Sequence, residues 1–326
     1  MLTALLEKYA THLIVLRGLS LRSVADYQKR VSEFFAWLAA DGRSTDIKAI
    51  GQDDVEAWLK HLYYEKHNAT LTRHTKLGAV SGFWRFLRYE QHVGEDITAL
   101  IPRPRVKRRM MQYFTRNEVV AFFSSCPVNT EKGIRDTCIL IILAFAGLRV
   151  GELCGLRMSD IMDDGDYVDI MVPEDIGKQG NYRTVDLWKT PTAFIRRWMA
   201  IRFAQGARID DPLFISYRRG NSVVGNQLSG KDIDRLIKTL GDAAGIRKVR
   251  IHSHMFRATH GSDLLFVNGF TVPAIAARLG HKNIATTDSY LPRRGRITQR
   301  YRSLRDYWLP WERLYTEGAV NAEIRE

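Results

Sequence analysis

Apolar side chains recur at helical spacing through the first hundred residues. Such spacing occurs at 27–38, at 55–64 directly after Asp53, and at 72–89, where aromatic residues dominate. Positions three and four apart lie on one face of a helix, so we expect three helices whose aromatic faces form a common core. Asp53 is the expected N-cap of the second helix. Basic residues on the opposite faces would be solvated or would contact phosphates.

The pattern changes after residue 114 and predicts a mixed region. Thr115, with Glu118 three residues later, forms a capping box that starts a helix. A buried helix is expected at 136–147, and strict alternation at 167–172 predicts a strand with a turn at 177–181 and a returning strand at 183–187. Further helices are expected at 191–203, 230–244, 254–268, 272–279 and around 283–290. The fold class is therefore mostly α, with a small β-sheet in the second region.

Residues 101–113 separate the two regions. Pro102 and Pro104 disfavour helix, and five basic residues follow or lie between them, namely Arg103, Arg105, Lys107, Arg108 and Arg109. We expect a helical domain at 1–100, a basic linker at 101–113 and a second domain with a C-terminal tail at 114–326. The linker is either an ordinary solvated segment or a strap that crosses a DNA backbone, and the basic domains on both sides favour the strap.

Composition narrows the class of protein. The 326 residues carry a net charge of +13, which favours a polyanionic partner. Residues 1–112 contribute +6 and the rest +7, so the excess is not confined to a single basic tail. Three cysteines without a C-x-x-C pair fit a reducing compartment. The longest apolar run, 138–148, is too short to span a membrane, and the N-terminus lacks the pattern of a signal peptide. We expect a cytoplasmic protein without membrane contact.

Four short segments hold residues whose chemistry fits together. Arg149 in AGLRVGEL follows a buried helix, and Lys178 in GKQGN lies at the tip of the expected hairpin. His254 and Arg257 in HSHMFR are three apart and share a helix face, where they suit an oxyanion. The fourth segment is LGHKNIATTDSY, in which histidine and tyrosine are nine apart. Taken singly, each is explained equally well by a helix cap, a solvated lysine, a surface ion pair or a core tyrosine.

In order and spacing, the four segments resemble the tyrosine recombinase (phage integrase) family, closest to its Xer-like and simple integrase-type members. The likeness covers nearly the whole chain, with an N-terminal helical basic region in front. It implies two domains that form a C-shaped clamp on DNA. One departure is Ala258, where many relatives carry a histidine directly after the second arginine.

The resemblance implies that Tyr290 is the nucleophile that attacks a DNA phosphodiester. Tyrosine has a pKa near ~10 and needs help to react at neutral pH. Arg149 and Arg257 would stabilise the extra charge on phosphorus by bidentate contacts. Attack by the tyrosine oxygen conserves the bond energy in a phosphotyrosine, so no external energy source is needed.

The remaining roles also follow from the resemblance. His254 would assist proton removal, His281 would hydrogen-bond a non-bridging oxygen, and Lys178 would protonate the leaving 5′-oxygen. Glu152 would orient its neighbours. The implied products are a 3′-phosphotyrosine and a 5′-hydroxyl, exchanged through a Holliday junction, with no metal or cofactor. The implied partner is double-stranded DNA with a specific recombination site, bound as two duplexes by a homotetramer, and accessory proteins are allowed for.

Rival interpretations share parts of this pattern. A type IB topoisomerase or a telomere-resolving enzyme would use the same nucleophile, and a DNA-binding regulator would keep the fold without the chemistry. His252, His254 and His260 would form a zinc cluster only if more ligand spacing supported it. The apolar cluster near 307–314 either folds back on its own domain or docks into a neighbouring subunit. Tyr301 and Tyr307 are the alternative nucleophiles, but neither has the spacing from histidine.

Overall fold

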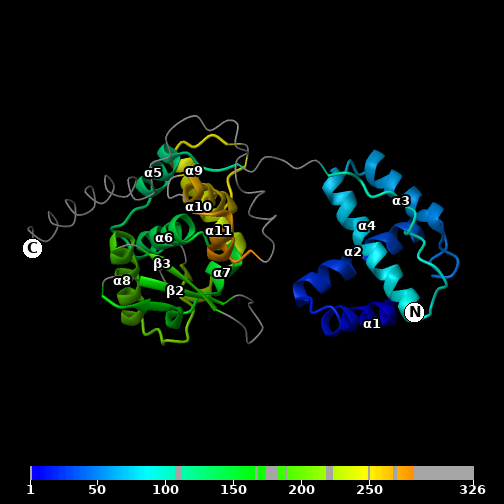
Figure 1. Ribbon diagram of the computed structural model, residues 1–326, viewed down its shortest axis with the longest axis horizontal. Coiled ribbons are helices and arrows are strands. Elements are labelled where there is room, and N and C mark those ends of the chain that lie inside the picture. The colour runs from blue at the N-terminus through cyan, green and yellow to red at the C-terminus, as the bar shows by residue number, and fades with distance from the viewer. Residues whose placement is uncertain are drawn as a thin grey trace, which may run out of the picture. The chain divides into compact units, whose positions relative to one another are not determined.

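The computed structural model describes residues 2–106, 112–165, 168–173, 182–187, 189–217, 223–248, 250–266 and 270–281. The chain divides into two compact units, Met1–Arg109 and Met110–Glu326 (Figure 1), and each unit has its own hydrophobic core. No helix in these ranges is both long and apolar enough to cross a lipid bilayer.

The described part of the first unit contains four helices, α1 (Leu2–Val15), α2 (Leu21–Ala40), α3 (Gln52–Tyr64) and α4 (Thr70–Tyr89). The three helices expected from apolar spacing are α2, α3 and α4, and the prediction that their aromatic residues form a core is confirmed. Trp58 of α3 and Trp84 of α4 are 1% and 0% exposed, and their rings lie 4.9 and 5.9 Å from that of Phe34 on α2.

The start of α3 differs from the prediction. The helix begins at Gln52, so its N-cap is Gly51 and not Asp53. Asp54 reaches backward from the third helical position, and its Oδ2 accepts the backbone N–H of Gly51 at 2.9 Å. A carboxylate at the third helical position therefore accepts the backbone N–H of the N-cap residue, which is the half of a capping box that does not need a side chain on the N-cap.

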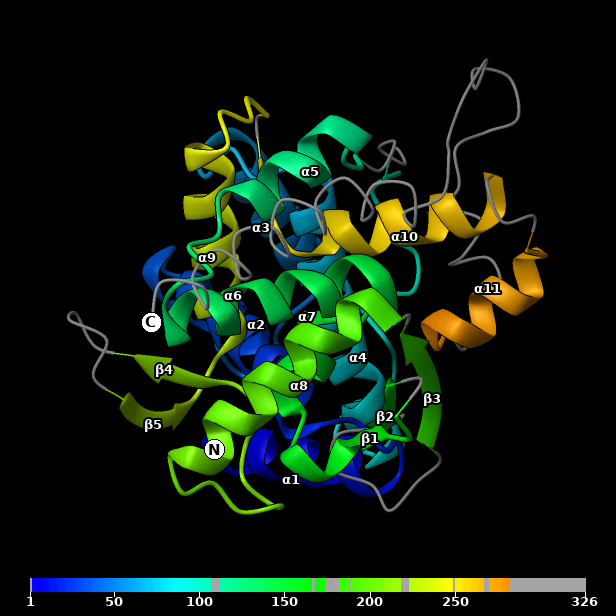
Figure 2. The same ribbon diagram turned by 90° about the vertical axis from the view of Figure 1, so that its left-hand side faces the viewer.

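The second unit combines helices with two small sheets, which lie apart from each other (Figure 2). Its helical elements are α5 (Arg116–Ser124), α6 (Glu131–Ile141), η1 (Ile142–Ala146), α7 (Val150–Gly155), η2 (Met158–Asp160), α8 (Lys189–Ala204), α9 (Gly230–Ala243), α10 (His254–Phe266) and α11 (Val272–Leu279). Its strands are β1 (Ile161–Asp163), β2 (Val168–Pro173), β3 (Tyr182–Leu187), β4 (Ile215–Tyr217) and β5 (Val223–Gln227). The expected fold class, mostly α with a small β-sheet in this region, is confirmed. The Thr115 capping box is also present, because Glu118 Oε2 accepts the Thr115 N–H at 2.7 Å.

Strands β1, β2 and β3 form an antiparallel sheet in that order. The predicted alternation is confirmed, because Val168, Ile170 and Val172 of β2 are 0% exposed. Val168 pairs with Leu187 and Val172 pairs with Arg183. Side chains alternate between the faces of a strand, so Arg183 lies on the same face of β3 as the buried Leu187.

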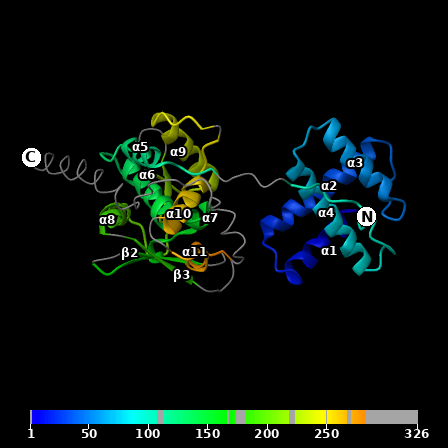
Figure 3. The ribbon, with the colours of Figure 1, turned by 45° about the horizontal axis from the view of Figure 1, so that its top comes forward.

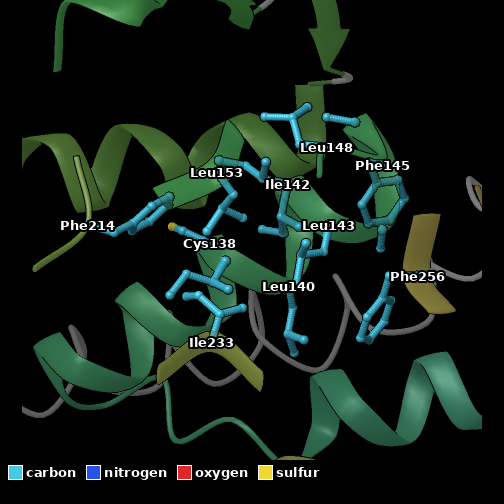
Figure 4. Packing of buried hydrophobic residues seen from close by; sticks show 14 of the residues in the cluster. Cys138, Leu140, Ile142, Leu143, Phe145, Leu148, Leu153, Phe214, Ile233 and Phe256 are labelled. Atoms are coloured by element: carbon cyan, nitrogen blue, oxygen red, sulfur yellow. The ribbon is translucent and has the colours of Figure 1, made fainter. Parts of the chain in front are cut away.

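Helix α6 and the π-helical turn η1 run through the core of the second unit, and residues 138–146 are at most 7% exposed. The same cluster includes Leu153 of α7, Ile233 of α9 and Phe256 of α10 (Figure 4). The turn ends at Gly147 with φ +61°, where an added Cβ would lie 2.6 Å from the His260 ring. The predicted buried helix thus starts five residues earlier, at Glu131, and ends at the expected glycine. This core fixes α7 and α10, which carry the candidate site residues Glu152, His254 and Arg257, and Arg149 directly precedes α7.

Candidate active site

Arg149 lies at the junction between the buried helix and α7. Its backbone N–H donates to Glu152 Oε2 at 2.8 Å, and its Nη1 donates to Glu152 Oε1 at 2.6 Å. The prediction that Arg149 follows a buried helix is confirmed, and α7 begins directly after it at Val150. The Arg149 side chain is 40% exposed, so its guanidinium is held in place and still accessible to a ligand from solvent.

Arg257 lies on α10, one turn after His254, and its side chain is 0% exposed. Its Nη1 donates to the carbonyl oxygen of Gly147 at 2.6 Å, and its Nη2 donates to the carbonyl oxygen of Leu279. Glu152 Oε2 lies 3.8 Å from the same Nη1. A buried guanidinium is stable only with acceptors and a counter-charge, and these neighbours supply both.

The two arginines meet at the C-terminal end of α11. Arg149 Nη2 donates to the carbonyl oxygen of Gly280 at 2.7 Å, while Arg257 binds the carbonyl oxygen of Leu279, the preceding residue. Gly280 caps α11 with φ +64°, and His281 follows. Unpaired carbonyls at a helix C-terminus attract cations, so this end of α11 is a natural anchor for both guanidinium groups. The first, third and fourth motif segments therefore come together in space.

Glu152 connects the arginines and is 7% exposed. Burial alone would raise the pKa of its carboxyl, but hydrogen bonds from Arg183 and the charges of Arg183 and Arg149 lower that pKa below its usual value. Arg183 donates from Nη1 and Nη2 to the two Glu152 oxygens at 3.1 and 2.7 Å. The carboxylate is therefore ionised between arginines, which fits the supporting role expected for Glu152.

The sequence-based list of site residues omitted Arg183. The alternation along β3 could have identified it, because Arg183 lies on the same face of the strand as Val185 and Leu187, both of which are buried. A charged residue in the apolar phase of a strand must find a buried partner. What the sequence does not supply is the identity of that partner, Glu152, 31 positions earlier.

Two imidazoles lie within the field of these arginines. Burial, followed by the charges of Arg257 and Arg149, lowers the pKa of His281 to about 4. Burial and the charge of Arg257 also lower the pKa of His254. Both rings are therefore neutral at pH 7, and a neutral imidazole offers one donor and one acceptor nitrogen to an oxyanion or a hydroxyl.

Two of the expected catalytic residues, Lys178 and Tyr290, lie outside the described residues. The alternative zinc cluster receives no geometric support where the chain is described, since no group of three His, Cys, Asp or Glu side chains there could hold a metal ion. His260 instead has its Nε2 3.4 Å from Arg278 Nε, and burial together with the charges of Arg278 and Arg257 lowers its pKa to about 3.

The basic boundary segment is described only in its first half. Arg103 and Arg105 are both exposed, and Nη2 of Arg103 lies 3.4 Å from Ser81 Oγ on α4. The carbonyl oxygen of Pro104 lies 3.1 Å from Nδ1 of His74, also on α4. The first residues of this segment are thus attached to the first unit. Lys107, Arg108 and Arg109 lie outside the described residues.

Comparisons with known proteins agree with this geometry. The sequence model of the "Phage integrase family" matches residues 112–294, and that of the "Phage integrase, N-terminal SAM-like domain" matches residues 6–91. The chain is 25% identical over 289 residues to Tyrosine recombinase XerC of Xylella fastidiosa (strain M23), covering 89% of this chain and 92% of that protein. It is 24% identical over 290 residues to Tyrosine recombinase XerD of Listeria monocytogenes serovar 1/2a (strain ATCC BAA-679 / EGD-e), covering 88% and 93%.

Among solved structures, the fold is similar to that of a lambda integrase tetramer bound to a Holliday junction. The TM-score is 0.66 at 16% sequence identity, over 92% of this chain and 80% of that one. The matching family models and these relatives identify the chain as a tyrosine site-specific recombinase, an enzyme that breaks and rejoins DNA. The chain belongs to the phage integrase family.

Proposed function

We propose that this recombinase cleaves DNA with Tyr290, using Arg149, Arg257, His254 and His281 to hold the scissile phosphate. One observation carries the proposal: both arginines bind consecutive carbonyl oxygens at the end of α11, directly before His281. Tyr290 follows His281 by nine residues, so the nucleophile belongs to the segment that leaves this site.

In the proposed reaction the Tyr290 oxygen forms a bond to phosphorus while the bond to the 5′-oxygen breaks. Guanidinium groups stabilise charge that grows on the non-bridging oxygens, and each such contact is worth about 10²-fold or more in rate. Arg149 is exposed enough to meet the phosphate directly. Arg257 is buried, so we propose that the phosphate approaches it from the Arg149 side.

Proton movements are assigned to the neutral histidines and to Lys178. His254, whose pKa is lowered, accepts the tyrosine proton, and His281 hydrogen-bonds a non-bridging oxygen. Lys178 donates a proton to the leaving 5′-oxygen. The 5′-hydroxyl of a partner strand then attacks the phosphotyrosine, which re-forms a phosphodiester and releases Tyr290. This sequence needs no cofactor.

The proposed substrate is a specific recombination site in double-stranded DNA, bound by both units of the chain. The net charge of +13, shared by both halves, supports a DNA partner. Residues Arg103, Arg105, Lys107, Arg108 and Arg109 are proposed to cross the DNA backbone between the domains. A homotetramer would bring two duplexes together. The lambda integrase structure named above is a tetramer bound to a Holliday junction. Accessory proteins are also allowed for. Three free cysteines fit a cytoplasmic location.

The decisive experiment is incubation of the full chain with a nicked DNA site that traps the covalent intermediate. Wild-type protein is expected to form a DNA adduct that survives denaturation, and Tyr290→Phe is expected to bind the site and form none. Tyr301→Phe is the matched control and should still form the adduct. No adduct with wild-type protein, or an adduct with Tyr290→Phe, would refute the proposal. Binding without any adduct would indicate a regulator, and relaxation of supercoiled DNA without a site would indicate a topoisomerase.

A further inference from the structure

Arg183 of β3 is a buried arginine that has no role in the reaction proposed above. Its side chain is 9% exposed and lies on the apolar face of the sheet, in register with Val172 of β2. A charged side chain is costly to bury unless it is paired, so its position must be matched by specific acceptors.

Three acceptors meet that requirement, and they come from two distant segments. Arg183 binds both oxygens of Glu152 on α7, at 3.1 and 2.7 Å, and its Nε donates to the carbonyl oxygen of Arg278 on α11 at 3.1 Å. An added Cβ on Gly280 would lie 2.7 Å from Arg183 Nη1, which shows how closely the guanidinium fits against the end of α11. One side chain on β3 therefore joins α7 to α11.

A second contact reinforces the connection between β3 and α11, which lie side by side (Figure 2 and Figure 3). Arg278 of α11 donates from Nη1 to Oδ1 of Asp186 at 2.5 Å and from Nη2 to the Asp186 carbonyl oxygen at 3.0 Å. Asp186 lies on the opposite face of β3 from Arg183, so the strand is fixed to α11 from both faces. The strand that carries Arg183 is thus bonded to the same helix whose end binds Arg149 and Arg257.

We propose that Arg183 is a positioning residue for DNA cleavage: it sets the distance and angle between α7, with Arg149, and the end of α11, with His281. The inference rests on the proposed function of the site. Arg183 acts through Glu152, which it aims at Arg149, and through the carbonyl of Arg278. Its Nη1 and Nη2 bind the two Glu152 oxygens and its Nε binds the Arg278 carbonyl oxygen, so its role is to position the groups that touch the phosphate.

The geometry also explains why the residue is arginine. A guanidinium has five N–H donors in a rigid plane and can bind two carboxylate oxygens and a carbonyl at once. A lysine ammonium carries the same charge on a flexible chain but cannot hold three acceptors in that arrangement. Lysine should therefore keep Glu152 ionised and lose part of the alignment between α7 and α11.

The test compares Arg183→Met and Arg183→Lys with Arg196→Met in the full chain. Arg196 is the matched control, because it also binds an acid through two contacts, to Asp163 at 2.7 and 2.6 Å, but on the exposed surface of the same unit. We expect Arg183→Met to slow single-turnover cleavage of the nicked site by about 10²-fold, as a misplacement near 1 Å would. DNA affinity should change by less than roughly threefold, since the proposed role is to align the groups that contact the phosphate and not to contact it. Arg196→Met should cleave at the wild-type rate.

The pH profile separates positioning from a general loss of structure. Glu152 faces Arg149 on α7, Arg183 on β3 and Arg257 on α10. Without Arg183, burial should raise the pKa of the Glu152 carboxyl, so cleavage by Arg183→Met should fall further as the pH drops toward 5. Arg183→Lys should restore the wild-type pH profile and recover about a tenth of the rate, given its single donor centre.

A double variant keeps the proposal testable if Arg183→Met folds poorly. Glu152→Gln with Arg183→Met removes both members of this ion pair, and Arg257 keeps the carbonyl oxygens of Gly147 and Leu279 as acceptors, so the double variant should be more stable than Arg183→Met. Its cleavage rate should match that of the slower single variant. The proposal is overturned if the two losses multiply, if Arg183→Met cleaves within twofold of Arg196→Met, or if its pH profile parallels that of the wild type. Each outcome is compared with adduct formation by the wild-type protein. If the wild-type protein formed no adduct, that result would refute the proposed function and not the role of Arg183.

Discussion

Replacing Glu152 by glutamine should test whether an ionised carboxylate holds the arginines together. Four hydrogen bonds end on its two oxygens, from the backbone and Nη1 of Arg149 and from Nη1 and Nη2 of Arg183. Glutamine keeps the shape but has one acceptor oxygen, and its amide nitrogen would face a guanidinium that can only donate. At least half of the contacts would be lost, and Arg183 would be left buried without its counter-charge.

The loss of stability in Glu152→Gln depends on how exposed each arginine partner is. Breaking a buried ion pair by removing one member costs about 3–5 kcal/mol. The Arg183 side chain is 9% exposed and takes nearly the full effect, whereas that of Arg149 is 40% exposed and is screened by water. We expect Glu152→Gln to lower the free energy of unfolding of the second unit by about 3 kcal/mol. The control Asp163→Asn, which breaks the exposed pair with Arg196, should cost less than about 1 kcal/mol.

The stability difference should depend on pH in one direction. Because the folded pKa of Glu152 is lowered from its usual value of 4.5, its contribution is fully present above that value and is lost as the pH falls through the folded pKa. The gap between wild type and Glu152→Gln should therefore be full at pH 7 and shrink below about pH 4.5. Hydrogen exchange of α7 and β3 amides at increasing urea concentrations would measure it. A gap no larger than that of Asp163→Asn, or one that does not change with pH, would refute the ionised carboxylate.

Two further predictions concern the end of α11. Gly280→Ala places a Cβ 2.7 Å from Arg183 Nη1 at φ +64°, so it should lower stability by about 1 kcal/mol or more and slow cleavage; equal stability and rate in denaturation and single-turnover assays would contradict the close fit. His281, whose pKa is lowered to about 4, should remain neutral down to pH 5, and NMR titration of its ring should show protonation only below that. A midpoint near its ordinary 6.5 would show that the ring does not feel Arg257 and Arg149.

Sequence reasoning succeeded where local signals end an element. The bounds of α11, Val272–Leu279, agree with the prediction because Thr271 caps its start, where its side chain accepts the Ala274 N–H, and Gly280 ends it in the left-handed region. It failed at the start of α3, where Gly51 and Asp54 share the capping between backbone and side chain. The π turn after Ile141 was also missed, because a single wide turn inside a buried helix leaves the apolar composition unchanged.

The same limit applies to the site. Arg149, Glu152, His254 and Arg257 are recognisable because short segments carry them, and the structure brings them together. Arg183 was missed because its importance comes from contacts 31 and 95 positions away, with Glu152 and the Arg278 carbonyl. Periodicity shows which face of a strand a residue takes, but not which distant segment lies against that face.

The backbone carbonyls that orient the arginines have a consequence for how this protein tolerates sequence change. Three of the acceptors, on Gly147, Leu279 and Gly280, belong to the main chain and exist whatever side chain is present. Mutational drift at Leu279 would leave the acceptor for Arg257 intact, provided that α11 still ends in the same turn. At such positions the backbone turn has to be kept, whereas the amino-acid type can change. The catalytic arrangement can therefore persist while much of the surrounding sequence is replaced.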